Sequence, residues 1–175
     1  MEKRIRLIPV FVCVLAAISL ATDIPAQRNP SDDRGESKEQ MALKNRATRP
    51  KQADIDKDVT LEGLLAKKDM SGFSTSKGAT VEGYVIQVEK EDDGDFHIAM
   101  APTAGETDTQ KWVIVEVTPA WRKRNASMSD AKVKQLHGKK VRVTGWLYYE
   151  MDDDQKDPRG TKWEIHPVTD ITVIK

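Results

Sequence analysis

Titratable side chains recur at one parity in three strand-like segments of the chain: His97, Glu116, Glu164 and His166. They alternate with the apolar residues, so we expect all four to point away from the interior that those apolar residues fill. Asp95, two residues before His97, extends the row. Imidazoles and carboxylates held on a rigid sheet can bind a transition metal or act as a general acid–base pair. They can equally form a network of cross-strand surface pairs.

One hypothesis for this set is a divalent metal site with His97, Glu116 and His166 as ligands. Two imidazoles and one carboxylate leave open positions for water and substrate, as catalytic metal sites require. Glu164 would be the general base of a metal-assisted hydrolase, because a metal lowers the pKa of its bound water. The sequence itself establishes no cofactor, and it contains no nucleophile elbow, phosphate-binding loop or His-Glu-x-x-His motif. Whether the protein is an enzyme therefore stays open.

Five segments that alternate with period two must position these residues. They span residues 80–89, 96–100, 112–117, 141–149 and 162–174. A helix with Ser129 as its N-cap is expected over 127–136, and a shorter one, capped by Asp58, over 59–65. Pro167 lacks the N–H that a strand ladder needs, so it predicts a bend or bulge in the last segment.

The order of these elements is three strands, a helix and two strands. This order predicts an OB fold, a mainly β, five-stranded Greek-key barrel with one helix between strands three and four. An SH3-like barrel or a small sandwich is the alternative, but neither expects a helix there. In an OB barrel the second, third and fifth strands are neighbours, which brings the titratable row together. Trp112 shares the outward parity, so the predicted binding face comprises Asp95, His97, Trp112, Glu116, Glu164 and His166.

Charge is balanced overall and segregated locally. The 175 residues include 28 Lys and Arg against 28 Asp and Glu, which gives no basic excess of the kind that a general nucleic-acid binder shows. Eight basic residues against one acid over 121–142 indicate an anionic-ligand patch or a solvated helix face. Acidic runs at 89–95 and 150–157 fall in the two loops with which OB barrels usually embrace oligonucleotides. These acids would repel phosphate and so disfavour nucleic acid as the partner.

The N-terminus predicts an export signal. Basic residues among the first six precede an apolar run over 7–20 that is shorter than the roughly 20 residues of a membrane span, and cleavage is expected after Ala21 or Ala26. Residues 27–57 have scarcely any large apolar side chain and predict a disordered linker before a barrel domain at 58–175. We therefore expect a periplasmic or secreted monomer without a stable membrane span after cleavage.

Four segments together resemble a group of uncharacterised exported bacterial proteins with an OB-fold-like domain. They are Asp95–Ile98, Val113–Pro119, Gly138–Leu147 and Trp163–Thr169. The most specific part is the C-terminal Trp-Glu-Ile-His-Pro-Val motif. The resemblance covers residues 61–174 and implies a bacterial envelope or secreted setting and an OB-like barrel, but no activity. Members of the group often have a histidine in the loop before the last strand, whereas residues 152–160 contain none.

Three functions follow from these observations. The first is an exported binding module that recognises a ligand or an envelope protein through the predicted face. The alternatives are a nucleic-acid-binding OB domain, suggested by the fold alone, and the metal-assisted hydrolase.

Overall fold

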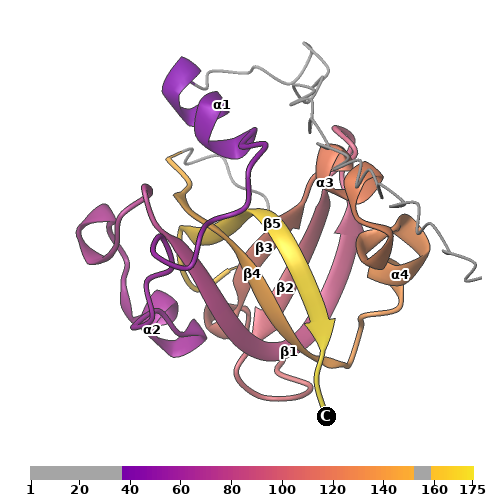
Figure 1. Ribbon diagram of the computed structural model, residues 1–175. Helices are drawn as coiled ribbons and strands as arrows, with labels where there is room; N and C mark the ends of the chain where they lie inside the picture. The colour runs from indigo at the N-terminus through magenta and orange to yellow at the C-terminus, as the bar shows by residue number, and fades with distance from the viewer. Residues whose placement is uncertain (1–36, 152–158) are drawn as a thin grey trace, which may run out of the picture.

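The computed structural model describes residues 37–151 and 159–175 and shows a closed β-barrel with short helices around it (Figure 1). The strands are β1 (Gly78–Lys90), β2 (Phe96–Ala101), β3 (Val113–Val117), β4 (Lys140–Tyr149) and β5 (Trp163–Val173). The α-helices are α1 (Lys38–Lys44), α2 (Leu61–Ala66), α3 (Pro119–Arg124) and α4 (Asp130–Lys134). Within these residues the 3-10 helices are η2 (Met70–Gly72), η3 (Thr109–Lys111) and η4 (Ala126–Met128). Each predicted strand boundary agrees with the structure to within two residues.

The barrel closes in the order β1-β2-β3-β5-β4, and β1 pairs with both β2 and β4. All pairs are antiparallel except β3 with β5, which is parallel. With helical segments between β3 and β4, this topology confirms the predicted OB fold.

The helical connection after β3 differs in detail from the expected single helix over 127–136. Pro119 starts α3 directly after β3, where the Thr118 side chain accepts a hydrogen bond from the Trp121 N–H. Ser129 precedes α4, as predicted, but α4 ends at Lys134. The earlier helix, α2, is capped by the Thr60 side chain rather than by Asp58.

Alternating apolar residues fill the barrel. Phe96, Ile98, Val115, Trp163 and Ile165 are all at most 1% exposed and belong to one core cluster. Their strand neighbours of opposite parity, which include the titratable row, must therefore point away from this core.

The predicted irregularity at Pro167 is confirmed. The register between β4 and β5 shifts on both sides of Gly145, which pairs with Val168. A Cβ atom on Gly145 would lie 2.5 Å from the carbonyl oxygen of Pro167, so only glycine permits this close approach.

The prediction of a disordered linker is wrong for residues 37–57. Ser37 and Gln40 form a capping box that starts α1, and Ile55 forms a β-bridge with Gly78. We call residues 37–50 the strap, which runs along the outside of the barrel in indigo and violet (Figure 1).

Polar bonds, rather than apolar burial, hold the strap. The indole N–H groups of Trp121 and Trp146 donate to the carbonyl oxygens of Arg46 (3.0 Å) and Thr48 (2.7 Å). The Arg46 guanidinium lies over the Trp146 ring, 4.5 Å from its centroid. The prediction of disorder was based on the low content of apolar residues, and such a count does not include hydrogen bonds and cation–π contacts that order a segment.

The predicted signal peptide at 1–26 and residues 27–36 of the predicted linker lie outside the described residues. Within the described ranges, no helix is long and apolar enough to cross a membrane.

Candidate functional site

The titratable row lies on the outer side of β2, β3 and β5, but it is not open to solvent. His166 is 2% exposed, Glu164 0%, Glu116 5% and Asp95 6%. Only His97 keeps 20% of its side chain accessible. The strap lies outside β5 and brings Lys44 into the row, and this explains how residues of outward parity come to be buried. Outward parity was therefore predicted correctly, while exposure was not.

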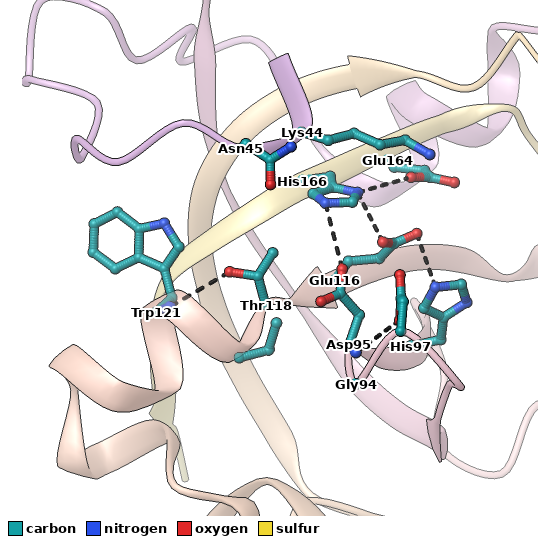
Figure 2. A network of polar contacts seen from close by, with 12 residues as sticks. Lys44, Asn45, Gly94, Asp95, His97, Glu116, Thr118, Trp121, Glu164 and His166 are labelled. Atoms are coloured by element: carbon teal, nitrogen blue, oxygen red, sulfur yellow. Dashed lines mark hydrogen bonds and ion pairs between the residues drawn. The ribbon is translucent and has the colours of Figure 1, made fainter. Parts of the chain in front are cut away.

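Glu116 lies between the two histidines. His97 and Glu116 are cross-strand partners on β2 and β3, and His97 Nε2 is 3.2 Å from Glu116 Oε1. The other carboxylate oxygen, Oε2, is 2.8 Å from His166 Nδ1. Two further carboxylates lie at longer distances from His166 (Figure 2). Asp95 Oδ2 is 3.7 Å from His166 Nε2, and Glu164 Oε2 is 3.8 Å from His166 Nδ1.

Three residues absent from the predicted site complete what we call the charge cluster. Lys44 comes from α1, and its Nζ lies 2.9 Å from Glu150 Oε2. Arg159 pairs through Nη1 with Glu164 Oε1, and its side chain is 6% exposed. From the sequence, Lys44 is expected in a linker and Arg159 in a loop. Neither segment has a periodic pattern that would point to a place in the site. The signal that could have found them is electrostatic, because buried carboxylates require nearby cations.

The cluster stabilises a proton on His166. Burial alone would lower the pKa of His166, but Glu116, Glu164 and Asp95 raise it from 6.5 to about 9. Burial would conversely raise the pKa of Glu116, and the two histidines hold it well below the usual value. At neutral pH the dominant pair is therefore a Glu116 carboxylate beside a His166 imidazolium.

Formal charges in the cluster nearly cancel. Among the described residues, four carboxylates face three cations, and His97 lies at the solvent edge. The carboxylates are Asp95, Glu116, Glu150 and Glu164, and the cations are Lys44, Arg159 and protonated His166. The carboxylates of Glu116, Glu164 and Glu150 raise the pKa of Lys44 against the effect of its own burial. Internal cations thus supply most of the charge that a bound metal would otherwise contribute.

The donor geometry for a metal differs from the predicted set. One donor atom each from Asp95, Glu116 and His166 lies within 4.8 Å of the others, so Asp95 rather than His97 completes this group. Glu164 Oε2 is buried and has no hydrogen-bond partner within the described parts of the chain. These residue types suit a divalent metal. To bind there, the metal would have to displace the proton of His166 and compete with Lys44 and Arg159.

Trp112 belongs to a separate, apolar part of the outer face. It packs with Ala99, Ala101 and Ile114, and its indole N–H donates to the carbonyl oxygen of Glu106 at 3.2 Å. The predicted binding face is thus divided into a covered polar part and an apolar part.

An open groove of about 400 Å³ lies at this apolar part. Val85, Ile86 and Trp112 contribute its apolar lining, and polar lining comes from Glu106, Thr107 and His137. His137 follows α4, and its position after a helix gave no sequence signal for a role.

Part of the basic stretch over 121–142 has structural partners. Arg122 pairs with Asp130 and donates to the carbonyl oxygens of Val117 and Gly94. Arg142 pairs with Glu82 on β1. These two arginines are therefore less available to an anionic ligand than the sequence suggests.

No family model and no curated protein matches the chain. Among solved structures, it is similar to an asparaginyl-tRNA synthetase of Entamoeba histolytica in complex with asparaginyl-adenylate (18% identity, TM-score 0.39, 62% of this chain and 23% of that one). It is also similar to the S. pombe Stn1–Ten1 complex (11%, TM-score 0.44, 68% and 78%). A third is OBody AM3L09 bound to hen egg-white lysozyme (11%, TM-score 0.45, 69% and 96%). The chain thus spans less than a quarter of the synthetase.

Proposed function

We propose that this protein is an exported, non-catalytic binding module that takes a small ligand or a short segment of a protein partner in the groove beside Trp112. The observation that carries the proposal is the groove itself, an open space of about 400 Å³ on the outer face of the barrel. Its combination of apolar lining with a few polar groups is typical of ligand sites. OB barrels usually bind their ligands on the side of strands two and three, where Trp112 and Ile114 lie.

The charge cluster is less accessible to a ligand than the groove, which supports this assignment. A substrate would have to displace the strap to reach Glu116 or His166, which are at most 5% exposed. The groove needs no such movement. We therefore assign recognition to the groove, and to the cluster the role of holding the strap on the barrel.

The test uses two variants that add the same charge at different places. Thr107→Arg fills the groove, whereas Thr172→Arg alters an exposed residue of β5. A library of small ligands and short peptides is titrated into the ¹⁵N-labelled protein. We expect the shifts induced by a binder to centre on residues 85–86, 105–107 and 137–138, and to vanish in Thr107→Arg but not in Thr172→Arg. Binding that survives in Thr107→Arg contradicts the proposal.

The metal-assisted hydrolase is a second candidate, which the donor group Asp95, Glu116 and His166 favours. These residues would hold the ion, and the ion would supply a nucleophilic water at neutral pH. A saturable rise in melting temperature with Zn²⁺ or Mn²⁺, absent in His166→Gln, supports metal binding. The resident cations favour the binding module, which predicts no such rise.

A function in nucleic-acid binding is supported only by the fold class, and the acidic loops disfavour it because they would repel phosphate. A gel-shift titration with single-stranded DNA and RNA at low salt tests it, since phosphate contacts weaken steeply with salt. Export is tested by the mass of the mature chain, which should begin after Ala21 or Ala26.

A further inference from the structure

We infer that the outer face of the barrel carries a binding site for a primary ammonium group, and that Lys44 of the strap fills this site from within the same chain. The site is distinct from the groove at Trp112, so it stands or falls independently of the proposed function.

Two kinds of contact define the ammonium site. The Lys44 Nζ lies 2.9 Å from Glu150 Oε2 and 5.1 Å from the centroid of the Tyr148 ring. Glu150 and Tyr148 are each 1% exposed, and the Lys44 side chain is 10% exposed. A carboxylate together with an aromatic face is the combination with which proteins recognise alkylammonium groups.

Further carboxylates make the site strongly selective for a cation. Glu116 and Glu164 also attract the Lys44 ammonium, and Figure 2 shows the lysine chain running above His166 towards Glu164. Removing Lys44 would take away the ammonium that lies 2.9 Å from the buried Glu150 carboxylate. Breaking a buried ion pair is costly, so the vacated site should take up another cation.

The site and its occupant come from different parts of the chain. Tyr148 lies near the end of β4 and Glu150 directly follows that strand, whereas Lys44 is 106 residues away from Glu150 in the sequence. The strap holds Lys44 near the site and gives it the high effective concentration of a tethered ligand. The ligand class that fits is therefore a lysine side chain of a basic protein segment, which would compete with the strap.

The experiment measures chemical complementation in the full chain. Lys44→Ala should lower the melting temperature by roughly 10 °C, because it breaks the buried ion pair between Lys44 and Glu150. We expect n-butylammonium to restore stability saturably, and tetramethylammonium, which has no N–H donor, to fail. Lys38→Ala removes an exposed lysine from the same helix and is the matched control. It should show no response to either amine beyond that of added salt.

Adding Glu150→Gln to Lys44→Ala should abolish the response to n-butylammonium. In the same assay a lysine-containing peptide should stabilise Lys44→Ala and leave the wild type unchanged. The inference is overturned if n-butylammonium stabilises Lys44→Ala no more than Lys38→Ala, or if Mn²⁺ restores stability and the amine does not.

If Lys44→Ala does not fold, a cooperative transition that returns with n-butylammonium supports the inference. If Lys44→Ala stays unfolded even with n-butylammonium, the test is an NMR measurement on the wild type. The ¹⁵N–¹H signal of the Lys44 ammonium should then be visible at neutral pH because its protons exchange slowly. Exchange as fast as that of Lys38 overturns the inference.

Discussion

The buried imidazolium of His166 makes stability depend on pH in a defined window. Its pKa is raised from 6.5 to about 9 because Glu116, Glu164 and Asp95 oppose the effect of burial. A group whose pKa is higher in the folded state stabilises that state fully below its unfolded pKa. The contribution should therefore be complete below about pH 6.5 and lost as the pH rises through 9.

The magnitude follows from the size of the shift. A displacement from 6.5 to about 9 corresponds to about 3.5 kcal/mol in the free energy of unfolding, at about 1.4 kcal/mol for each pH unit, and most of it falls between pH 6 and 9.5. Urea denaturation at intervals from pH 6 to 9.5 measures this loss. His166→Gln is the reference, because the titrating groups outside the charge cluster contribute equally to both proteins.

We expect the difference in unfolding free energy between wild type and His166→Gln to shrink by about 3 kcal/mol across this window. An NMR titration of the His166 ring in the wild type provides the independent readout. A difference that does not change with pH, together with a His166 pKa at or below 6.5, would refute the reasoning.

Three other substitutions, with Glu82→Gln as a control for the first, test separate parts of the structure. Glu116→Gln removes the nearest counter-charge of His166, so urea denaturation at pH 7 should show a loss of about 3 kcal/mol in the free energy of unfolding. Glu82→Gln breaks an exposed pair with Arg142 and should lower the free energy of unfolding by less than about 1 kcal/mol. Gly145→Ala brings a Cβ to within 2.5 Å of the Pro167 carbonyl oxygen, so a loss of about 1–3 kcal/mol in thermal unfolding is expected, and an unchanged melting temperature contradicts the close approach. Trp146→Phe removes the hydrogen bond to Thr48 and should cost about 1 kcal/mol. In this variant, amide hydrogen exchange should become faster in residues 44–50 and stay unchanged in β2. Equally faster exchange in both segments would show that Trp146 does not hold the strap specifically.

Local pattern was sufficient for the barrel. The period-two alternation of segments such as 113–117 and 141–149 located the strands, and the position of the helix fixed the topology. Parity also placed His97, Glu116, Glu164 and His166 on the outer side of neighbouring strands. Pro167 predicted the irregularity of β5, which the shifted register around Gly145 confirms.

The environment of the site depended on contacts that no local pattern encodes. Lys44 reaches Glu150 across 106 residues from a segment with little apolar content, and this contact helps to bury the cluster. Hydrogen bonds from Trp121 and Trp146 order the strap, and no local pattern indicates which distant carbonyl oxygens these indole groups reach. Trp112 shares the parity of the titratable row, but parity does not reveal that one face is divided into two environments.

The position of a bound ligand tests the central claim most directly. For any binder found in the titration, intermolecular nuclear Overhauser effects report which side chains lie against it. We predict contacts from the ligand to the Trp112 indole and the Ile86 side chain, with none to the His97 ring. Contacts to His97 and Asp95 without contacts to Trp112 would contradict the assignment of recognition to the groove.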